Sequence, residues 1–243
     1  ESEERRLMAH FGKMNLGTLE IQLNAVDFVK LSDEQNTTVF PEGSQVTVKK
    51  NRNFDFVGWI NAGKWEVNAL SANYVYDEHK VNLLKTDETI LRVRPMAETD
   101  GKQSIAMFNS IRGIKGEIFV DDPTNKSGQN EKITDFPKVK VTKPSFVYYN
   151  FKDLYRGAYD STRFYYTIAP FEFDSLDNFN EKSFRLKGEL TSAGIFPKIT
   201  EDLKIMPDYS FGFSAGAPKE GYEFYGTNAK YDNKIILSNN GLQ

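Results

Sequence analysis

The sequence predicts an all-β chain, in which antiparallel sheets stack as a sandwich or as a wide, folded β-solenoid, with one or two short helices. The first observation is a two-residue rhythm, as in residues 19–24, where apolar and polar side chains alternate. Such a strand turns one face to a core and the other to water. The second is the composition, with 19 Phe and 12 Tyr but only 2 Trp. Phe and Tyr favour pleated, half-buried surfaces.

The beginning of the chain is the best helix candidate. Over residues 2–13, acidic residues follow Ser2, and Leu7, Met8 and Phe11 recur at helical spacing. We therefore expect an N-terminal helical segment over residues 1–16. From there the period changes to two, which predicts a first β-rich unit over residues 17–95.

A second β-rich unit is expected over residues 96–243, although one continuous domain would also fit the pattern. The boundary is placed at the polar stretch 95–101. Just after it, residues 105–111 carry apolar side chains at a spacing that suits a short helix and nearly as well a strand. Residues 121–132 contain turn-forming residues throughout and are expected to form a long exposed loop.

Charge and composition narrow the classes of function. The net charge is −3, so there is no positive field to attract nucleic acid. No apolar run reaches the roughly 18–20 residues that span a bilayer, so no direct membrane span is expected. The chain has no cysteine, which excludes disulfides and thiolate chemistry. It opens without Met and ends in a polar stretch, as expected of a piece of a longer polypeptide.

Long stretches of the chain resemble a known group of proteins. They comprise residues 54–93 with the subsegments 61–63 and 80–83, residues 116–128, and residues 148–242 with the subsegments 169–176, 192–197 and 237–242. They resemble large, uncharacterised, β-rich exported proteins of Bacteroidota bacteria. The resemblance implies an extracytoplasmic location in the periplasm, at the outer membrane or on the cell surface. It also implies a longer parent protein, but no activity.

Signals for catalysis are weak, and we expect no enzyme. Neither His10 nor His79 belongs to an HExxH pattern, and both are expected at the surface. Facing carboxylates on neighbouring strands could in principle hydrolyse glycosides. The acids considered for this role are Glu172, Asp174, Asp177 and Glu189. Strand alternation, however, places Glu172 and Asp174 opposite Phe171 and Phe173, on an ordinary solvent face.

No cofactor is expected, and calcium is the single cation considered. Asp121, Asp122 and Asn125 could supply several of the oxygen ligands that Ca²⁺ requires. The spacing lacks the alternating ligands of an EF-hand, and Lys126 adds an opposing charge. A solvated turn is therefore the favoured interpretation of this loop.

Tyrosines in the second half form the one candidate ligand surface. Tyrosine offers a broad apolar face and a polar tip, which suits sugars and peptides. The candidate residues are Tyr148, Tyr149, Tyr155, Tyr159, Tyr165 and Tyr166. Packing in the core and at its rim is the competing explanation.

Three hypotheses follow. The first is a non-catalytic structural or interaction segment, whose partners are neighbouring segments of the same polypeptide or other envelope proteins. Edge strands at residues 148–149 or 235–237 would allow such pairing. The second is a glycan- or peptide-binding β module, and the third is an enzyme of the glycosidase type.

Overall fold

The computed structural model describes residues 11–96, 104–130, 132–151 and 159–243. The all-β prediction is confirmed, because the regular elements of these residues are strands apart from one short 3₁₀ turn, η1 (Glu42–Ser44). No helix in the described part of the chain is long and apolar enough to cross a membrane.

The predicted helices are not found where the structure can be compared with them. Most of residues 2–13 lies outside the described residues, but Phe11 to Lys13 belong to strand β1 (Phe11–Asn15), so the helix is wrong there. Residues 11–13 pair with β2 (Glu20–Asn24). This cross-strand pairing outweighs the local helix preference that the spacing of apolar residues indicated. Residues 105–111 hold two short strands, β9 (Ile105–Ala106) and β10 (Ile111–Arg112).

Contacts divide the chain into two compact units that alternate along the sequence. Unit 1 takes residues 1–89, 113–143 and 172–179, and unit 2 takes residues 90–112, 144–171 and 180–243. Each unit is therefore assembled from three separated stretches.

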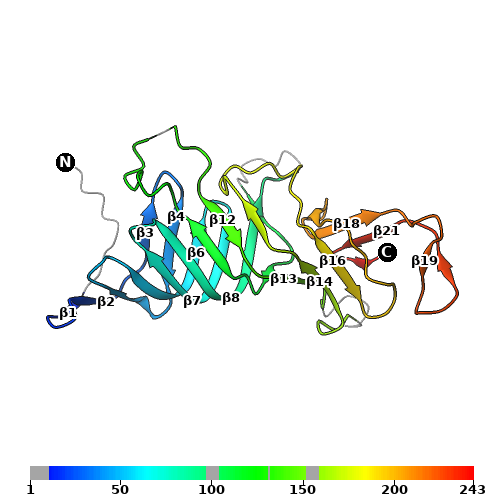
Figure 1. Cartoon of the computed structure of the whole chain (residues 1–243), viewed down its shortest axis with the longest axis horizontal. Helices are drawn as coiled ribbons and strands as arrows, with labels where there is room; N and C mark the ends of the chain where they lie inside the picture. Colours follow the sequence, from blue (N-terminus) through cyan, green and yellow to red (C-terminus); the bar gives the residue numbers. More distant parts are fainter. Residues whose placement is uncertain (1–10, 97–103, 131, 152–158) are drawn as a thin grey trace. The chain divides into compact units, whose positions relative to one another are not determined.

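Unit 1 contains both long and short strands (Figure 1). Besides β1 and β2 they are β3 (Val29–Ser32), β4 (Thr37–Pro41), β5 (Gln45–Val48), β6 (Phe54–Ala62), β7 (Trp65–Val75), the first part of β8 (Lys80–Val93), β11 (Gly116–Phe119), β12 (Lys138–Val141) and most of β15 (Phe171–Phe173). Hydrogen bonding follows the order β1-β2-β5-β6-β7-β8, and the strands from β1 to β7 in this order run antiparallel. β4 also pairs with β6, and β11 joins β8 to β12.

The core of unit 1 lies under one face of this sheet. In β6, Phe54, Phe56 and Ile60 are at most 5% exposed, while Asp55 and Val57 are exposed. Trp65 begins β7 and packs against Phe173, with ring centroids 6.1 Å apart. The alternation seen in the sequence thus sets the face that each strand buries.

Unit 2 is built from shorter strands. They are β9, β10, β13 (Ser145–Tyr148), β14 (Phe164–Ile168), β16 (Gly188–Ser192), β17 (Lys204–Ile205), β18 (Phe211–Ala215), β19 (Tyr222–Glu223), β20 (Lys230–Tyr231), β21 (Ile235–Ser238) and β22 (Gly241–Leu242). One sheet path runs β10-β13-β14-β16, a second runs β17-β18-β21-β22, and β19 and β20 form a separate hairpin. Their core contains the fully buried side chains of Phe164, Leu190 and Phe211.

Candidate interaction surfaces

The six candidate tyrosines do not form one platform. Tyr149 and Tyr166 are fully buried, so assigning them to a ligand surface is wrong. Tyr159 is 9% exposed and stacks on Phe164, with ring centroids 4.0 Å apart. Tyr155 lies outside the described residues. Neighbouring side chains along a strand point to opposite faces, so adjacent tyrosines lie on opposite sides of the sheet.

Tyr148 and Tyr165 do share an outer face of unit 2. They are paired across β13 and β14, with ring centroids 6.5 Å apart. Phe146 completes the group, 6.2 Å from Tyr148 and 6.0 Å from Tyr165 between centroids. All three rings are half-buried.

The loop proposed as a calcium site is folded on itself, and it is not exposed throughout. Asp121 and Asn125 are only 1% and 4% exposed, because the carboxylate of Asp121 serves as an internal acceptor. It accepts hydrogen bonds from Gln35 Nε2 at 3.2 Å, Asn125 Nδ2 at 3.0 Å and the Asp122 amide at 2.7 Å. Burial raises the pKa of the Asp121 carboxyl.

Metal-binding side chains do not converge in the described ranges. Within them, no group of three or more His, Asp or Glu side chains could hold a metal ion. Asp122 turns outward and accepts from the Thr124 amide at 2.8 Å. The oxygens considered for calcium thus serve as acceptors for neighbouring groups of the chain.

The acids considered for glycoside hydrolysis fall in both units. Glu172, Asp174 and Asp177 belong to unit 1, whereas Glu189 belongs to unit 2. Glu172 forms an ion pair with Lys140 at 2.8 Å, and Glu189 forms one with Lys198. These are surface ion pairs of the kind that alternation predicts.

His79 is buried, so its expected surface position is wrong. It is 2% exposed and occupies the turn between β7 and β8 with a φ of 48°. Its Nδ1 atom lies 2.7 Å from the hydroxyl of Tyr74. Its ring meets that of Tyr74 edge to face, with centroids 6.0 Å apart, a contact that the polar sequence around His79 did not indicate. His10 lies outside the described residues.

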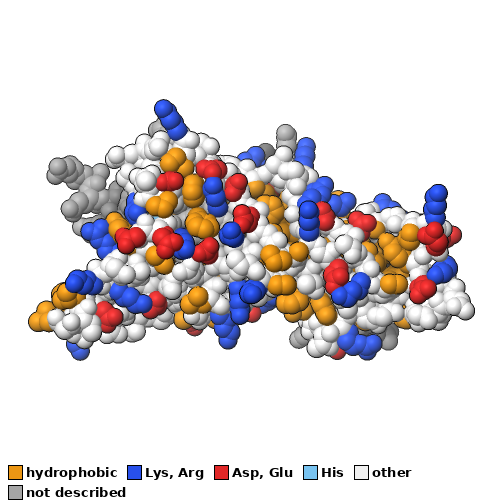
Figure 2. Space-filling model, in the orientation of Figure 1, with side chains coloured by type: hydrophobic (Ala, Val, Ile, Leu, Met, Phe, Trp, Pro, Cys, Tyr) orange, Lys and Arg blue, Asp and Glu red, His pale blue; other side chains and the backbone are white. Residues whose placement is uncertain are grey.

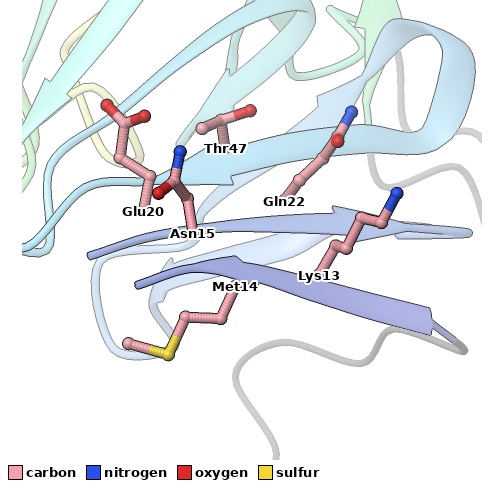
Figure 3. Close-up of a pocket in the computed structure, with 6 residues that line it drawn as sticks. All are labelled: Lys13, Met14, Asn15, Glu20, Gln22 and Thr47. Atoms are coloured by element: carbon pink, nitrogen blue, oxygen red, sulfur yellow. The ribbon is translucent and has the colours of Figure 1, made fainter. Parts of the chain in front are cut away.

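The β1–β2 hairpin has one polar and one apolar face. On the polar side, a hollow of about 540 Å³ is lined mainly by Lys13, Asn15, Glu20, Gln22 and Thr47. Figure 3 shows these side chains on one side of the strands and Met14 pointing to the other. The hairpin is thus an amphipathic ribbon.

The apolar side of this ribbon continues the core of unit 1. Cross-strand pairing sets Met14 opposite Ile21, Ile21 opposite Val48, and Val48 opposite Phe54. Along this row the exposed fraction falls from 52% at Met14 to 36% at Ile21 and 4% at Phe54. Leu16, at the end of the hairpin, is 81% exposed. Among the described residues, the core-facing side of the sheet therefore extends beyond the side chains that cover it.

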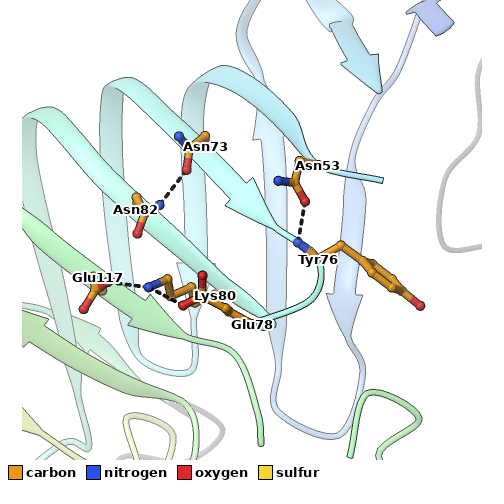
Figure 4. A network of polar contacts seen from close by, with 7 residues as sticks. All are labelled: Asn53, Asn73, Tyr76, Glu78, Lys80, Asn82 and Glu117. Carbon is orange, nitrogen blue, oxygen red and sulfur yellow. Dashed lines mark hydrogen bonds and ion pairs between the residues drawn. The ribbon is translucent and has the colours of Figure 1, made fainter. Parts of the chain in front are cut away.

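The opposite face of unit 1 is polar and tied by hydrogen bonds (Figure 4). Asn82 Nδ2 donates to Asn73 Oδ1 at 2.8 Å across β8 and β7. Lys80 Nζ lies 2.7 Å from carboxylate oxygens of both Glu117 and Glu78, and these bonds raise the pKa of Lys80. A row of polar and charged side chains is stable in contact with water, whereas the row from Met14 to Phe54 is apolar.

An aromatic cluster surrounds the β19–β20 hairpin of unit 2. Phe196 lies at its centre, with ring centroids 5.9 Å from Tyr222, 5.6 Å from Phe224 and 5.4 Å from Tyr231. Phe224 and Tyr225 are exposed by 36% and 60%. Hydrophobic side chains are visible at the surface in this part of the molecule (Figure 2).

A polar cleft of about 430 Å³ lies in the same unit. It is lined by Arg185, Thr200, Glu201, Asp202, Lys204, Phe213 and Ser214. Burial, and then the charge of Glu201, raise the pKa of Tyr222 in the aromatic cluster. Sequence reasoning missed both features, because residues 185–204 and 222–231 form no local motif.

Comparisons with family models, with curated proteins and with solved structures found no match to this chain.

Proposed function

We propose that this chain is a non-catalytic interaction segment of an extracytoplasmic protein, and that it docks another β-sheet layer on the apolar side of β1, β2 and β5. The observation that carries the proposal is the row from Met14 to Phe54, whose exposure rises steadily toward the edge. The resemblance to exported β-rich proteins supports the location. The partner is a neighbouring segment of the same polypeptide or another envelope protein.

The apolar face of β1, β2 and β5 is continuous with the core of unit 1. In unit 1 the same face is covered by apolar side chains, and at Phe54 only 4% of the residue remains exposed. A flat apolar strand face is best covered by another sheet, since stacked sheets interdigitate their inner side chains. Leaving it in water costs about 25 cal/mol for each Å² of apolar surface.

The edge of the sheet adds a second means of association. β1 ends the hydrogen-bonded path of its sheet in the described residues, so one side of its backbone is available for pairing. Unpaired edges of this kind associate with other strands through backbone hydrogen bonds. Pairing at this edge would place the apolar faces of two sheets in register.

Self-association tests this proposal, because a second copy presents the same kind of sheet layer. We expect sedimentation velocity to show association that increases with concentration. Ile21→Lys puts a charge on the apolar face and should weaken the association at least about tenfold, the equivalent of about 1.4 kcal/mol. Gln22→Lys adds the same charge to the adjacent residue on the polar face and should leave it nearly unchanged.

Two outcomes contradict the proposal. One is a chain that stays monomeric at every concentration while Ile21→Lys lowers Tm, which would mean that the face is covered within its own chain. The other is an equal effect of Ile21→Lys and Gln22→Lys, which would attribute association to charge alone.

A further inference from the structure

We infer that β1 pairs antiparallel with β1 of a second copy of the chain, with Met14 opposite Met14, which rests on the edge pairing proposed above and names its partner. Among the described residues, β1 pairs with β2 and ends the path of its sheet. Its outer edge carries backbone groups that a further strand can satisfy. Pairing at the edge leaves the apolar face open to another sheet layer and makes that face wider.

The two unlike faces of the hairpin restrict how two copies can meet. Residues that lie opposite each other in a sheet share a face, and Figure 3 shows Lys13 and Asn15 on the polar side with Met14 pointing the other way. A two-fold axis perpendicular to the sheet makes the two β1 strands antiparallel and keeps both apolar faces on one side. A two-fold axis along the strands would join an apolar face to a polar one, so the antiparallel arrangement is favoured.

The side chains of β1 then select the register. The two-fold axis can set Gly12, Lys13, Met14 or Asn15 opposite its own copy. With Lys13 at the axis, two ammonium groups lie directly opposite each other, which is destabilising. With Gly12 there, no side chains meet at the axis, and with Asn15 there, the pairing falls mainly on the turn. With Met14 at the axis, Lys13 lies opposite the uncharged Asn15 of the second copy.

The register with Met14 at the axis also matches the apolar side chains. Met14 and Leu16 are 52% and 81% exposed in the single chain. Leu16 would lie beside Gly12 of the second copy, which has no side chain and whose Cβ position is 3.3 Å from Leu23 Cδ2. Leu16 can therefore contact Leu23 of the second copy. The apolar row from Phe54 to Met14 would continue without interruption from one copy into the other.

The polar side offers a complementary charge in the same register. Asn15 pairs with Glu20 of β2, so Lys13 of the second copy would approach this carboxylate with Asn15 between them. The Asn15 side chain is held by the turn, because its Oδ1 atom accepts hydrogen bonds from the Gly17 amide at 2.9 Å and the Thr18 amide at 3.2 Å. The group opposite Lys13 is thus fixed in position and adds no positive charge.

Cysteine crosslinking of the full chain tests the register, because the chain has no cysteine of its own. Opposite residues of an antiparallel pair have Cα atoms about 4.5–5.5 Å apart, a separation that a disulfide bridges. In oxidised glutathione, Met14→Cys should form covalent dimers at least about tenfold faster than Lys13→Cys or Leu16→Cys, since thiols held opposite each other react without a chance collision. Lys13→Cys reports the register with Lys13 at the axis. Leu16→Cys controls for accessibility, because Leu16 is more exposed than Met14.

A charge substitution in the Met14→Cys background gives a second measurement. Asn15→Asp keeps the acceptor of the turn and sets a carboxylate opposite Lys13 of the second copy. Crosslinking should become about threefold faster at low salt, and this gain should disappear in about 1 M NaCl. Asn180→Asp is the matched control, because Asn180 is an exposed turn acceptor of unit 2, bonded by the Lys182 amide at 3.0 Å. It should leave the rate unchanged.

Other orders of crosslinking overturn the inference. Fastest crosslinking of Lys13→Cys would put Lys13 at the axis, and fastest crosslinking of Leu16→Cys would mean that the thiols meet by collision. Association in sedimentation with no preference for Met14→Cys would assign the edge to a strand of another protein, while docking on the apolar face would stand. A chain that stays monomeric at every concentration and forms no preferred crosslink would overturn the pairing and count against the docking proposal as well.

Discussion

For a single residue, the pairing of its strand decides whether the side chain is buried or faces outward. Tyr148 and Tyr149 are neighbours in sequence, yet Tyr148 is half-buried on an outer face and Tyr149 is fully buried. The hydroxyl of Tyr149 donates to the Phe211 carbonyl oxygen at 3.0 Å, a contact between residues 62 positions apart. No local pattern could reveal this bond. The sequence therefore located the aromatic residues but did not show which of them are buried and which face outward.

Tyr149→Phe is predicted to destabilise the chain by about 1 kcal/mol, because a buried carbonyl loses its donor. Burial raises the pKa of Tyr149 well above its ordinary value. Above about pH 10, this phenol ionises in the unfolded chain but stays neutral in the folded one, so its linkage lowers stability as pH rises. Urea unfolding at pH 8 and pH 10.5 measures both effects.

The substitution should make the alkaline loss of stability smaller. Tyr148→Phe, on the outer face, is the control and should change neither quantity. A Tyr149→Phe variant as stable as the parent, with the same alkaline loss, would show that the hydroxyl has no net structural role.

At the element scale, close contacts between strands fix positions that the hydrophobic pattern leaves open. Gly188 lies in β16 opposite Ile168 of β14. A Cβ atom built on Gly188 would lie 1.9 Å from the Thr167 carbonyl oxygen. Alternation correctly predicted strands here, but it gave no sign that one position must lack a side chain. The prediction of an N-terminal helix was wrong at residues 11–13 for a related reason. The cross-strand pairing of Lys13 with Gln22 is a contact that the local spacing of apolar residues does not reveal.

Gly188→Ala is predicted to cost about 1–3 kcal/mol, because β14 and β16 must separate to admit the methyl group. Thermal unfolding should show a lower Tm, and hydrogen exchange should show faster opening of β16. Gly216→Ala is the matched control, because nothing lies within 4 Å of its Cβ position and the residue is exposed. Equal losses in the two variants would contradict the packing argument, because Gly→Ala at an open position lowers the entropy of the unfolded chain and is not expected to destabilise.

At the scale of the whole molecule, the sequence predicted the fold class but not how the chain is shared between units. Short alternating runs contain enough information to identify strands, because alternation is local. Unit membership depends on pairings between distant segments, such as Ile118 of β11 with Val81 of β8. Unit 1 therefore includes residues 113–143, which lie beyond the boundary expected near residue 95.

Residues 17–95 expressed alone are therefore predicted not to fold cooperatively. Without β11, β8 keeps β7 but loses its partner on the other side at residues 80–83, and Val81 and Leu83, now at most 2% exposed, lose part of their cover. Circular dichroism during urea titration should show a shallow transition with a small m-value, whereas the full chain unfolds cooperatively. A sharp transition for residues 17–95 would mean that the strands from β2 to β8 bury enough apolar surface by themselves. Residues 113–143 would then be a late addition to a core that is already complete.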